Sequence, residues 1–151
     1  MNIDFAAIAT EGLKAMRDLE THVRSSGLEK SLIELVKTRV SQINGCAYCI
    51  DMHTKDARAE GESEQRLYAL PAWHETPFFS TRERAALRWA EALTTIAGKP
   101  MPESLIEETL GFFGEKELAN LTLAVIAING WNRLAISSGM PAGSYRVGQW
   151  N

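Results

Sequence analysis

Apolar residues recur along the chain at intervals of three and four, the spacing that gives an α-helix one apolar face. No segment keeps the alternation typical of a half-buried strand. A first stripe, formed by Ile3, Ala6, Ala9, Leu13, Met16 and Leu19 or Val23, predicts one helix of about twenty residues. It ends at Ser25-Ser26-Gly27. A second helix is predicted from near Glu29 to Ile43, before Asn44-Gly45, since glycine suits the left-handed end of a helix.

The rest of the chain continues in the same pattern, with clear start and stop signals. A third helix is predicted from at or just after Cys46 to about Glu60. Pro71 ends a short one and begins a loop with Pro77 and two phenylalanines. Ser80 and Glu83 match a capping box. The further helices are predicted over residues 64–70, 81–96, 103–113 and 116–136, the last two separated at Gly114-Glu115.

These elements predict an all-α protein, a single-domain helical bundle over residues 1–151 with no linker. The last helix is apolar on more than one face. Such a helix is buried on all sides. We therefore expect it either at the centre of the bundle or covered by another subunit, which makes an oligomer one of two interpretations.

Composition and charge narrow the class of protein. The chain has 151 residues, of which 45% are apolar and 23% charged, as in ordinary globular domains. Its net charge is −3, and its basic residues stand among acidic ones, which argues against nucleic-acid binding. Its start resembles no signal peptide, and its longest apolar run, Leu123 to Ile128, is far shorter than the ~18 residues of a membrane span. We expect a cytoplasmic protein without a membrane partner.

The two cysteines of the chain, Cys46 and Cys49, lie three residues apart. A disulfide closing so short a loop removes little entropy from the unfolded chain, so redox chemistry or metal binding is favoured over a structural staple. On one helix at about 100° per residue, Cys46, Cys49 and His53 fall within an arc of roughly 60°, while Tyr48 lies near the opposite side. The spacing thus gathers two thiols and one imidazole on one face.

The first turn of a helix favours an anion, and in Cys-x-x-Cys motifs this position lowers a thiol pKa from about 8.5 towards neutrality. His53, one turn beyond Cys49, is placed to accept or relay the thiol proton. A peroxide would oxidise one cysteine to a sulfenic acid, which the other converts to a disulfide. A zinc site made by Cys46, Cys49, His53 and one carboxylate is an alternative. His22 and His74 are interpreted as surface or satisfied core residues.

Glu34 lies among Leu32, Ile33, Leu35 and Val36, in the helix that leads directly into the cysteine turn. A short helix–turn–helix connection brings the two helices together, and an acid in apolar surroundings needs a partner. Glu34 is therefore a candidate to orient His53 or to hold a proton. The other interpretation of Glu34 is an exposed charge on the helix face.

The stretch from Glu34 to His53, with Cys46-Ala-Tyr-Cys49-Ile-Asp-Met-His53, resembles the alkylhydroperoxidase D / carboxymuconolactone decarboxylase superfamily. Flanking segments add to the resemblance, which covers nearly the whole chain: residues 70–80, 82–93 and 128–135. It implies an all-α fold that assembles into trimers or hexamers, and a peroxidase that needs no bound cofactor. It implies Cys49 as the residue that attacks the hydroperoxide, Cys46 as the resolving cysteine, and His53 with Glu34 as the proton relay.

The resemblance also implies a dithiol reductant, carried in the founding enzymes by a lipoyl-bearing protein. Those enzymes have a histidine directly before the second cysteine, where this chain has Tyr48. A phenol is a poor proton carrier at neutral pH. The decarboxylase branch does not rely on a cysteine pair, so the peroxidase is the leading hypothesis. A redox-sensing or interaction protein of the same fold, with little turnover, and the zinc site are the alternatives.

Overall fold

The computed structural model describes residues 3–150 and contains α-helices, one 3-10 helix and, among these residues, no strand. The predicted all-α fold is therefore confirmed. The elements are α1 (Phe5–Ile8), α2 (Thr10–Arg24), α3 (Lys30–Asn44), α4 (Ala47–Ala59), α5 (Glu64–Ala69), η1 (Leu70–Glu75, the 3-10 helix), α6 (Thr81–Thr94) and α7 (Glu103–Ser138).

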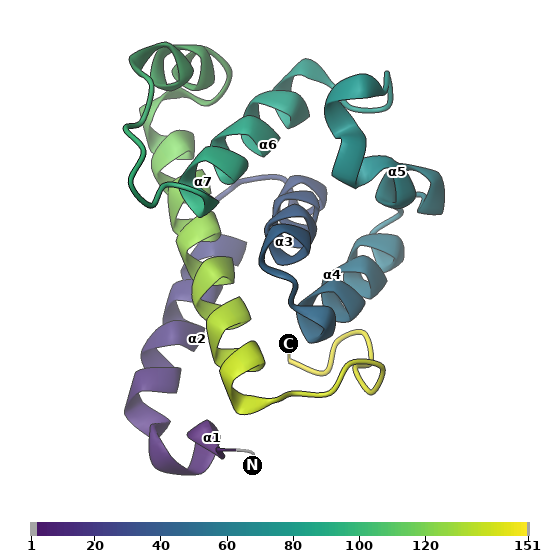
Figure 1. Ribbon diagram of the computed structural model, residues 1–151, viewed down its shortest axis with the longest axis vertical. Coiled ribbons are helices and arrows are strands. Elements are labelled where there is room, and N and C mark those ends of the chain that lie inside the picture. Colours follow the sequence, from purple (N-terminus) through teal and green to yellow (C-terminus); the bar gives the residue numbers. More distant parts are fainter. Residues whose placement is uncertain (1–2, 151) are drawn as a thin grey trace.

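Helix α3 is at the centre of the bundle and packs against α4, α6 and α7, while α2 lies along α7 (Figure 1). Nine of its fifteen residues are buried, and four of these nine are polar or charged: Glu34, Lys37, Thr38 and Ser41. The main core joins α2, α3, α6 and α7 and includes Val23, Ile33, Val36, Val40, Leu121, Val125 and Ile128. A smaller cluster around Trp73 fills the space between α3, α6 and η1.

Helix α7 is a core helix with one open edge. Leu121 and Ile128 are fully buried, but Ile126 and Ile136 are 53% and 52% exposed. The all-round burial expected for this helix is therefore only partly present within one chain.

Two boundaries differ from the sequence prediction. The N-terminal helix is not continuous, because Ala9 has φ −117° and ψ 46° and separates α1 from α2. Asp4 caps α1 through the Ala7 N–H, and the exposed residues around Ala9 have no packing that would enforce one straight helix. The first part of the loop predicted from Pro71 is instead η1, since proline is tolerated at the start of a helix, where its missing N–H is not needed. The part with Pro77 and the two phenylalanines is non-helical, as predicted.

The predicted separation at Gly114 is present as a break inside α7, where Gly114 has φ 63° and ψ 174°. This backbone region is essentially restricted to glycine, and another residue there costs about 1–3 kcal/mol.

We therefore expect Gly114→Ala to lower the unfolding free energy by that amount, and the melting temperature by roughly 2–10 °C. Gly111 lies one turn earlier in a helical conformation with open space around it, so Gly111→Ala should stabilise by up to about 1 kcal/mol. Thermal unfolding followed by circular dichroism measures the stability of both variants. Equal changes in melting temperature would contradict the assignment of Gly114 to a backbone conformation that requires glycine.

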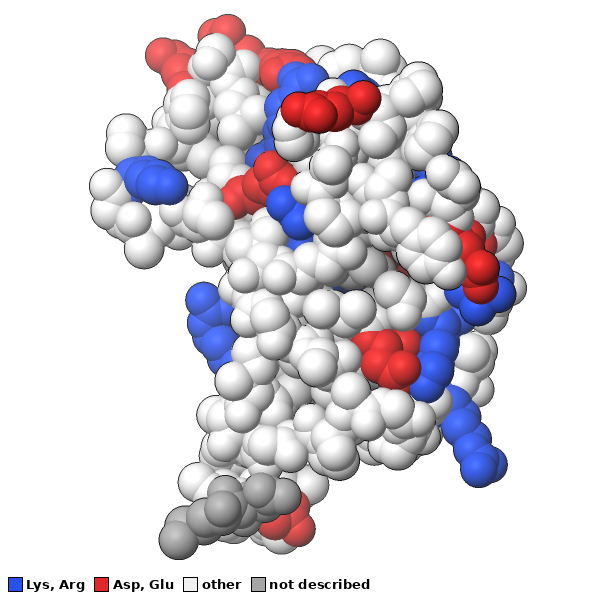
Figure 2. Space-filling model, turned by 45° about the vertical axis from the view of Figure 1, so that its right-hand side comes forward, with Lys and Arg blue, Asp and Glu red and all other residues white. Residues whose placement is uncertain are grey.

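Acidic and basic side chains are mixed over the molecular face in Figure 2, without a large area of one sign. Many pair locally, as Arg82 does with Glu29 at 2.8 Å and with Glu117 at 3.0 Å. Among the described residues, no helix combines the length and hydropathy that crossing a bilayer requires.

Candidate functional site

The two cysteines lie at the start of α4, directly after a tight turn from α3. Gly45 ends α3 in the left-handed conformation, with φ 68° and ψ 31°, as the sequence predicted. Cys46 is the N-cap residue of α4, and its Sγ accepts a hydrogen bond from the Cys49 N–H at 3.4 Å. The structure joins Cys46 and Cys49 in a disulfide. The pair thus stands where backbone N–H groups favour a thiolate once the disulfide is reduced.

His53 and Glu34 form a buried hydrogen-bonded pair beside this turn. Nδ1 of His53 on α4 lies 2.7 Å from Oε2 of Glu34 on α3. The two residues are 2% and 4% exposed. The contact predicted from the helix–turn–helix connection is therefore present, and Glu34 is not an exposed charge. The carboxylate fixes the orientation of the ring and stabilises a proton on Nδ1.

Two cations support the Glu34 carboxylate from neighbouring turns. Arg24, at the end of α2, brings Nη2 to 3.7 Å from Oε1 of Glu34, and it also bonds Glu20 at 3.2 Å. Lys37, one turn after Glu34, is 1% exposed and pairs with Glu20. Burial alone would raise the pKa of Glu34, but the His53 hydrogen bond and the charges of His53, Lys37 and Arg24 outweigh it and lower that pKa below 4.5. Glu34 is held ionised in the protein interior.

A second carboxylate lies next to the pair. Asp56, one turn after His53 on α4, accepts hydrogen bonds from the Tyr145 hydroxyl at 2.9 and 3.0 Å. Burial of Asp56, together with the nearby charge of Glu34, raises its pKa above 3.8, and the Tyr145 hydrogen bond acts in the opposite direction. Burial and the Asp56 neighbour likewise raise the pKa of Tyr145.

The C-terminal segment, residues 140–150, covers the cysteine turn. Tyr145 packs in one buried cluster with Cys46, Cys49 and Tyr48, and Nε1 of Trp150 donates to the Tyr48 hydroxyl at 3.0 Å. Helix geometry predicts Tyr48 on the opposite side of α4, yet it is buried in the same cluster as the cysteines, where Trp150 of this segment bonds its hydroxyl. Within this cluster, Cys46 and Cys49 are only 1% and 2% exposed. A reactant therefore reaches the sulfur atoms only if side chains around them move.

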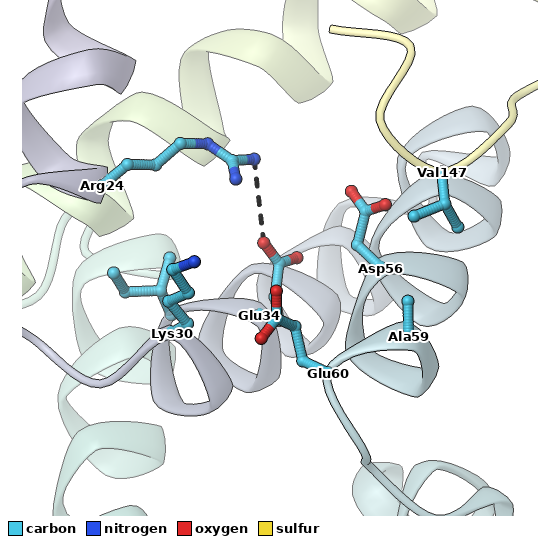
Figure 3. Close-up of a pocket in the computed structure, with 8 residues that line it drawn as sticks. Arg24, Lys30, Glu34, Asp56, Ala59, Glu60 and Val147 are labelled. Carbon is cyan, nitrogen blue, oxygen red and sulfur yellow. Dashed lines mark ion pairs between the residues drawn. The ribbon is translucent and has the colours of Figure 1, made fainter. Parts of the chain in front are cut away.

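A cavity of about 250 Å³ reaches the Glu34 carboxylate from the surface (Figure 3). Glu34 and the buried Ile33 belong to its inner wall, and Asp56 lies beside Glu34. Exposed residues form its rim, namely Arg24, Lys30, Ala59, Glu60 and Val147.

Metal binding was one interpretation of the motif. In the oxidised form, the disulfide of Cys46 and Cys49 offers no thiolate to zinc. Glu34, His53 and Asp56 each have a potential ligand atom within 4.8 Å of the other two. However, both oxygens of Glu34 already face partners, Oε2 the ring of His53 and Oε1 the cation of Arg24. The arrangement favours a hydrogen-bonded proton relay over a cation site.

The other two histidines lie outside this site, as predicted. His22 contacts Oδ1 of Asn120 through Nε2 at 3.0 Å, and His74 is an exposed residue of η1.

Sequence reasoning found Cys46, Cys49, His53 and Glu34 but not the residues around them. The one-turn spacings from Glu34 to Lys37 and from His53 to Asp56 were usable signals. Nothing in the local pattern connects Arg24 or Tyr145 with the site. The catalytic roles of the four predicted residues remain predictions.

Comparison with known proteins identifies similar chains. The sequence profile of the carboxymuconolactone decarboxylase family matches residues 10–92. The protein YdfG of Bacillus subtilis (strain 168) is 44% identical over 142 residues, which are 94% of this chain and 97% of YdfG.

Solved structures agree with the sequence comparison. ATU0492 from Agrobacterium tumefaciens, for which an antioxidant defence role of the AhpD type has been suggested, is 40% identical, with a TM-score of 0.90 over 95% of this chain and 99% of that one. A peroxidase-related protein with an alkylhydroperoxidase AhpD core, from Ralstonia eutropha JMP134, is 19% identical. It has a TM-score of 0.79 over 92% of this chain and 74% of its own, and shares the fold.

Proposed function

Since the chain belongs to the carboxymuconolactone decarboxylase family, we propose that it is a peroxidase of the alkylhydroperoxidase D type, which reduces hydroperoxides through Cys46 and Cys49. The observation that carries the proposal is the buried contact of 2.7 Å between His53 and Glu34, one turn from a cysteine pair at a helix N-terminus. A dithiol next to a proton relay is the arrangement that thiol oxidation by a peroxide needs.

The first half-reaction uses Cys49 as the nucleophile. His53 accepts the thiol proton, and the thiolate attacks one peroxide oxygen as the O–O bond breaks. Cys49 becomes a sulfenic acid, and the leaving alkoxide takes the proton from His53 to give an alcohol. Glu34 stabilises the imidazolium that exists between these two proton transfers.

The second half-reaction closes the disulfide. Cys46 attacks the Cys49 sulfenic acid, the S–S bond forms and one water leaves. The disulfide between Cys46 and Cys49 supports this step, because it is the product that the step would form. An external dithiol must then reopen the bond by exchange, and we propose dihydrolipoamide on a lipoyl-bearing protein as that donor.

Thiol titration tests the proposal directly, because Cys46 and Cys49 are the two cysteines of the chain. The reduced protein should show two thiols and lose both after one equivalent of cumene hydroperoxide. Dihydrolipoamide should restore both. Thiols that survive the hydroperoxide would reject the peroxidase.

One observation favours a redox sensor as the second candidate. The C-terminal segment packs directly on the disulfide through Tyr145, so reduction can change how this segment lies. A sensor predicts negligible turnover but a different assembly size on oxidation, measured by light scattering. Equal sizes in both redox states would exclude it.

We also propose that the protein assembles as a homotrimer or homohexamer. The half-exposed Ile126 and Ile136 on the open edge of α7 are apolar surface that a second copy would cover. Sedimentation at several concentrations measures the subunit number.

A further inference from the structure

We propose that Asp56, held by Tyr145, is a further positioning residue of this site and acts through His53. Its carboxylate supplies a second negative charge beside the imidazole, so that His53 can hold a proton taken from a cysteine thiol. The inference rests on the thiol–His53 relay of the proposed function. It concerns the charge around the relay rather than the substrate.

The geometry places Asp56 at the relay. One carboxylate oxygen of Asp56, one of Glu34 and one ring nitrogen of His53 all lie within 4.8 Å of one another. An opposite charge at about 4–6 Å favours the protonated form of an imidazole. Asp56 is on the same helix face as His53, one turn later, so the two side chains stay neighbours as long as α4 is intact.

The hydrogen bond from Tyr145 stabilises the ionised form of Asp56 at this position. Burial and the charge of Glu34 both disfavour the ionised form of Asp56, and a hydrogen bond to the carboxylate favours it. The Tyr145 hydroxyl provides that bond to both carboxylate oxygens. Tyr145 is itself fixed, because its carbonyl accepts a bond from Nζ of Lys55 at 3.0 Å and its ring is buried against the cysteines.

The other charges around the relay come from three helices and do not duplicate Asp56. Arg24 and Lys37 are cations, and Glu20 is already paired with both. The charge of His53 also acts on Glu20, but the carboxylate of Glu20 is engaged by its two cations. The carboxylates grouped with a ring nitrogen of His53 within 4.8 Å are those of Glu34 and Asp56. The charged and titratable groups of the surrounding elements are Glu20 and Arg24 from α2, Lys30, Glu34 and Lys37 from α3, His53, Asp56 and Glu60 at α4, and Tyr145 from the C-terminal segment.

The test follows alkylation of the reduced thiols by iodoacetamide as a function of pH, since only the thiolate reacts. In Asp56→Asn the imidazolium loses a neighbouring charge, so the thiolate forms at higher pH. We expect the midpoint of the rate profile to move up by about 1 pH unit, which makes alkylation about tenfold slower below it. Tyr145→Phe should move the midpoint in the same direction by less, and Asp56→Glu should bring it back towards that of the unmodified protein.

Asp51→Asn is the matched control. Asp51 is also on α4 and also ties the C-terminal segment, through the Gly143 N–H at 3.1 Å and Lys55 at 2.8 Å, but it is not part of the carboxylate–imidazole group. A profile for Asp56→Asn that coincides with those of Asp51→Asn and the unmodified protein would overturn the proposal. If Asp56→Asn does not fold, the rate profile of Tyr145→Phe is compared with those of Asp51→Asn and the unmodified protein instead. Coincidence of the three profiles would again overturn the proposal.

No hydroperoxide takes part in this assay, so the two proposals fail separately. A shifted profile in a chain that does not reduce hydroperoxides keeps the role of Asp56 and rejects the peroxidase. An unshifted profile in a chain that does reduce hydroperoxides rejects the role of Asp56 and keeps the peroxidase.

Discussion

Cys49→Ser is expected to reduce hydroperoxide turnover to the uncatalysed rate, because the variant lacks the thiolate that attacks the peroxide. A serine hydroxyl in the same position cannot form a sulfenic acid or a disulfide. Cys46→Ser should also lose dithiol-dependent turnover, since no intramolecular disulfide can form, but its Cys49 should still be oxidised once. The double variant should be no less active than Cys49→Ser alone, because residues acting as one unit do not contribute additively.

Consumption of cumene hydroperoxide with dihydrolipoamide measures this, and dimedone labelling with mass spectrometry locates the sulfenic acid. Label on Cys49 in Cys46→Ser, and none on Cys46 in Cys49→Ser, assigns the attacking cysteine. Ala47→Ser is the matched control, because Ala47 is an exposed residue in the same turn and the change adds a hydroxyl without removing a thiol. Unchanged turnover in both single cysteine variants would refute the cycle.

The helices could be predicted because their signals are local. The capping box of α6 is present as expected: Glu83 N–H donates to Ser80 Oγ at 3.2 Å, and Ser80 N–H donates to Glu83 Oε2 at 2.7 Å. Gly139 ends α7 with φ 70°, in the same way as Gly45 ends α3. Each of these features involves residues within a few positions of one another, which is the range that sequence patterns describe.

The site could be predicted only as far as two consecutive helices determine it. Glu34 and His53 meet because α3 and α4 are joined by one turn, so a contact over nineteen positions was within reach. Arg24 reaches Glu34 from α2, and Tyr145 reaches Asp56 over 89 positions from the C-terminal segment. Such contacts depend on the packing of the whole bundle, and helical periodicity carries no information about them.

Two cations that the sequence prediction missed, Lys37 and Arg24, explain how the Glu34 carboxylate can be buried. Lys37 and Arg24 offset the carboxylates of Glu20 and Glu34, so the site contains a balanced group instead of a lone acid. The proton that His53 would take from a thiol then moves within a group whose charge is already compensated. This is the physical reason to place the relay at Glu34 and His53 rather than at an exposed carboxylate.

Glu34→Gln is expected to slow thiol oxidation by about 10²–10⁴-fold, the usual contribution of a proton-transfer partner. The amide can keep a hydrogen bond to His53 but carries no charge to stabilise the imidazolium. Stopped-flow oxidation of the reduced protein by cumene hydroperoxide measures the rate. Glu11→Gln, at an exposed position of α2, is the control and should react like the unmodified protein.

The same variant should change how stability depends on pH. The folded-state pKa of Glu34 is lowered below 4.5, so its charge contributes stability that is fully present above the unfolded pKa and is lost as pH falls through the folded one. Glu34→Gln should therefore be less stable than the unmodified protein at pH 7, and urea unfolding should show the difference shrinking below about pH 4. Part of the acid sensitivity of the unmodified protein should remain in Glu34→Gln, because the pKa of Glu20 is also lowered. Burial raises the pKa of Glu20, but the charge and hydrogen bond of Lys37 outweigh this effect. A stability difference that stays constant from pH 7 into the acid range would mean that Glu34 is not ionised in the folded protein, and a relay in which its charge stabilises His53 would then be untenable.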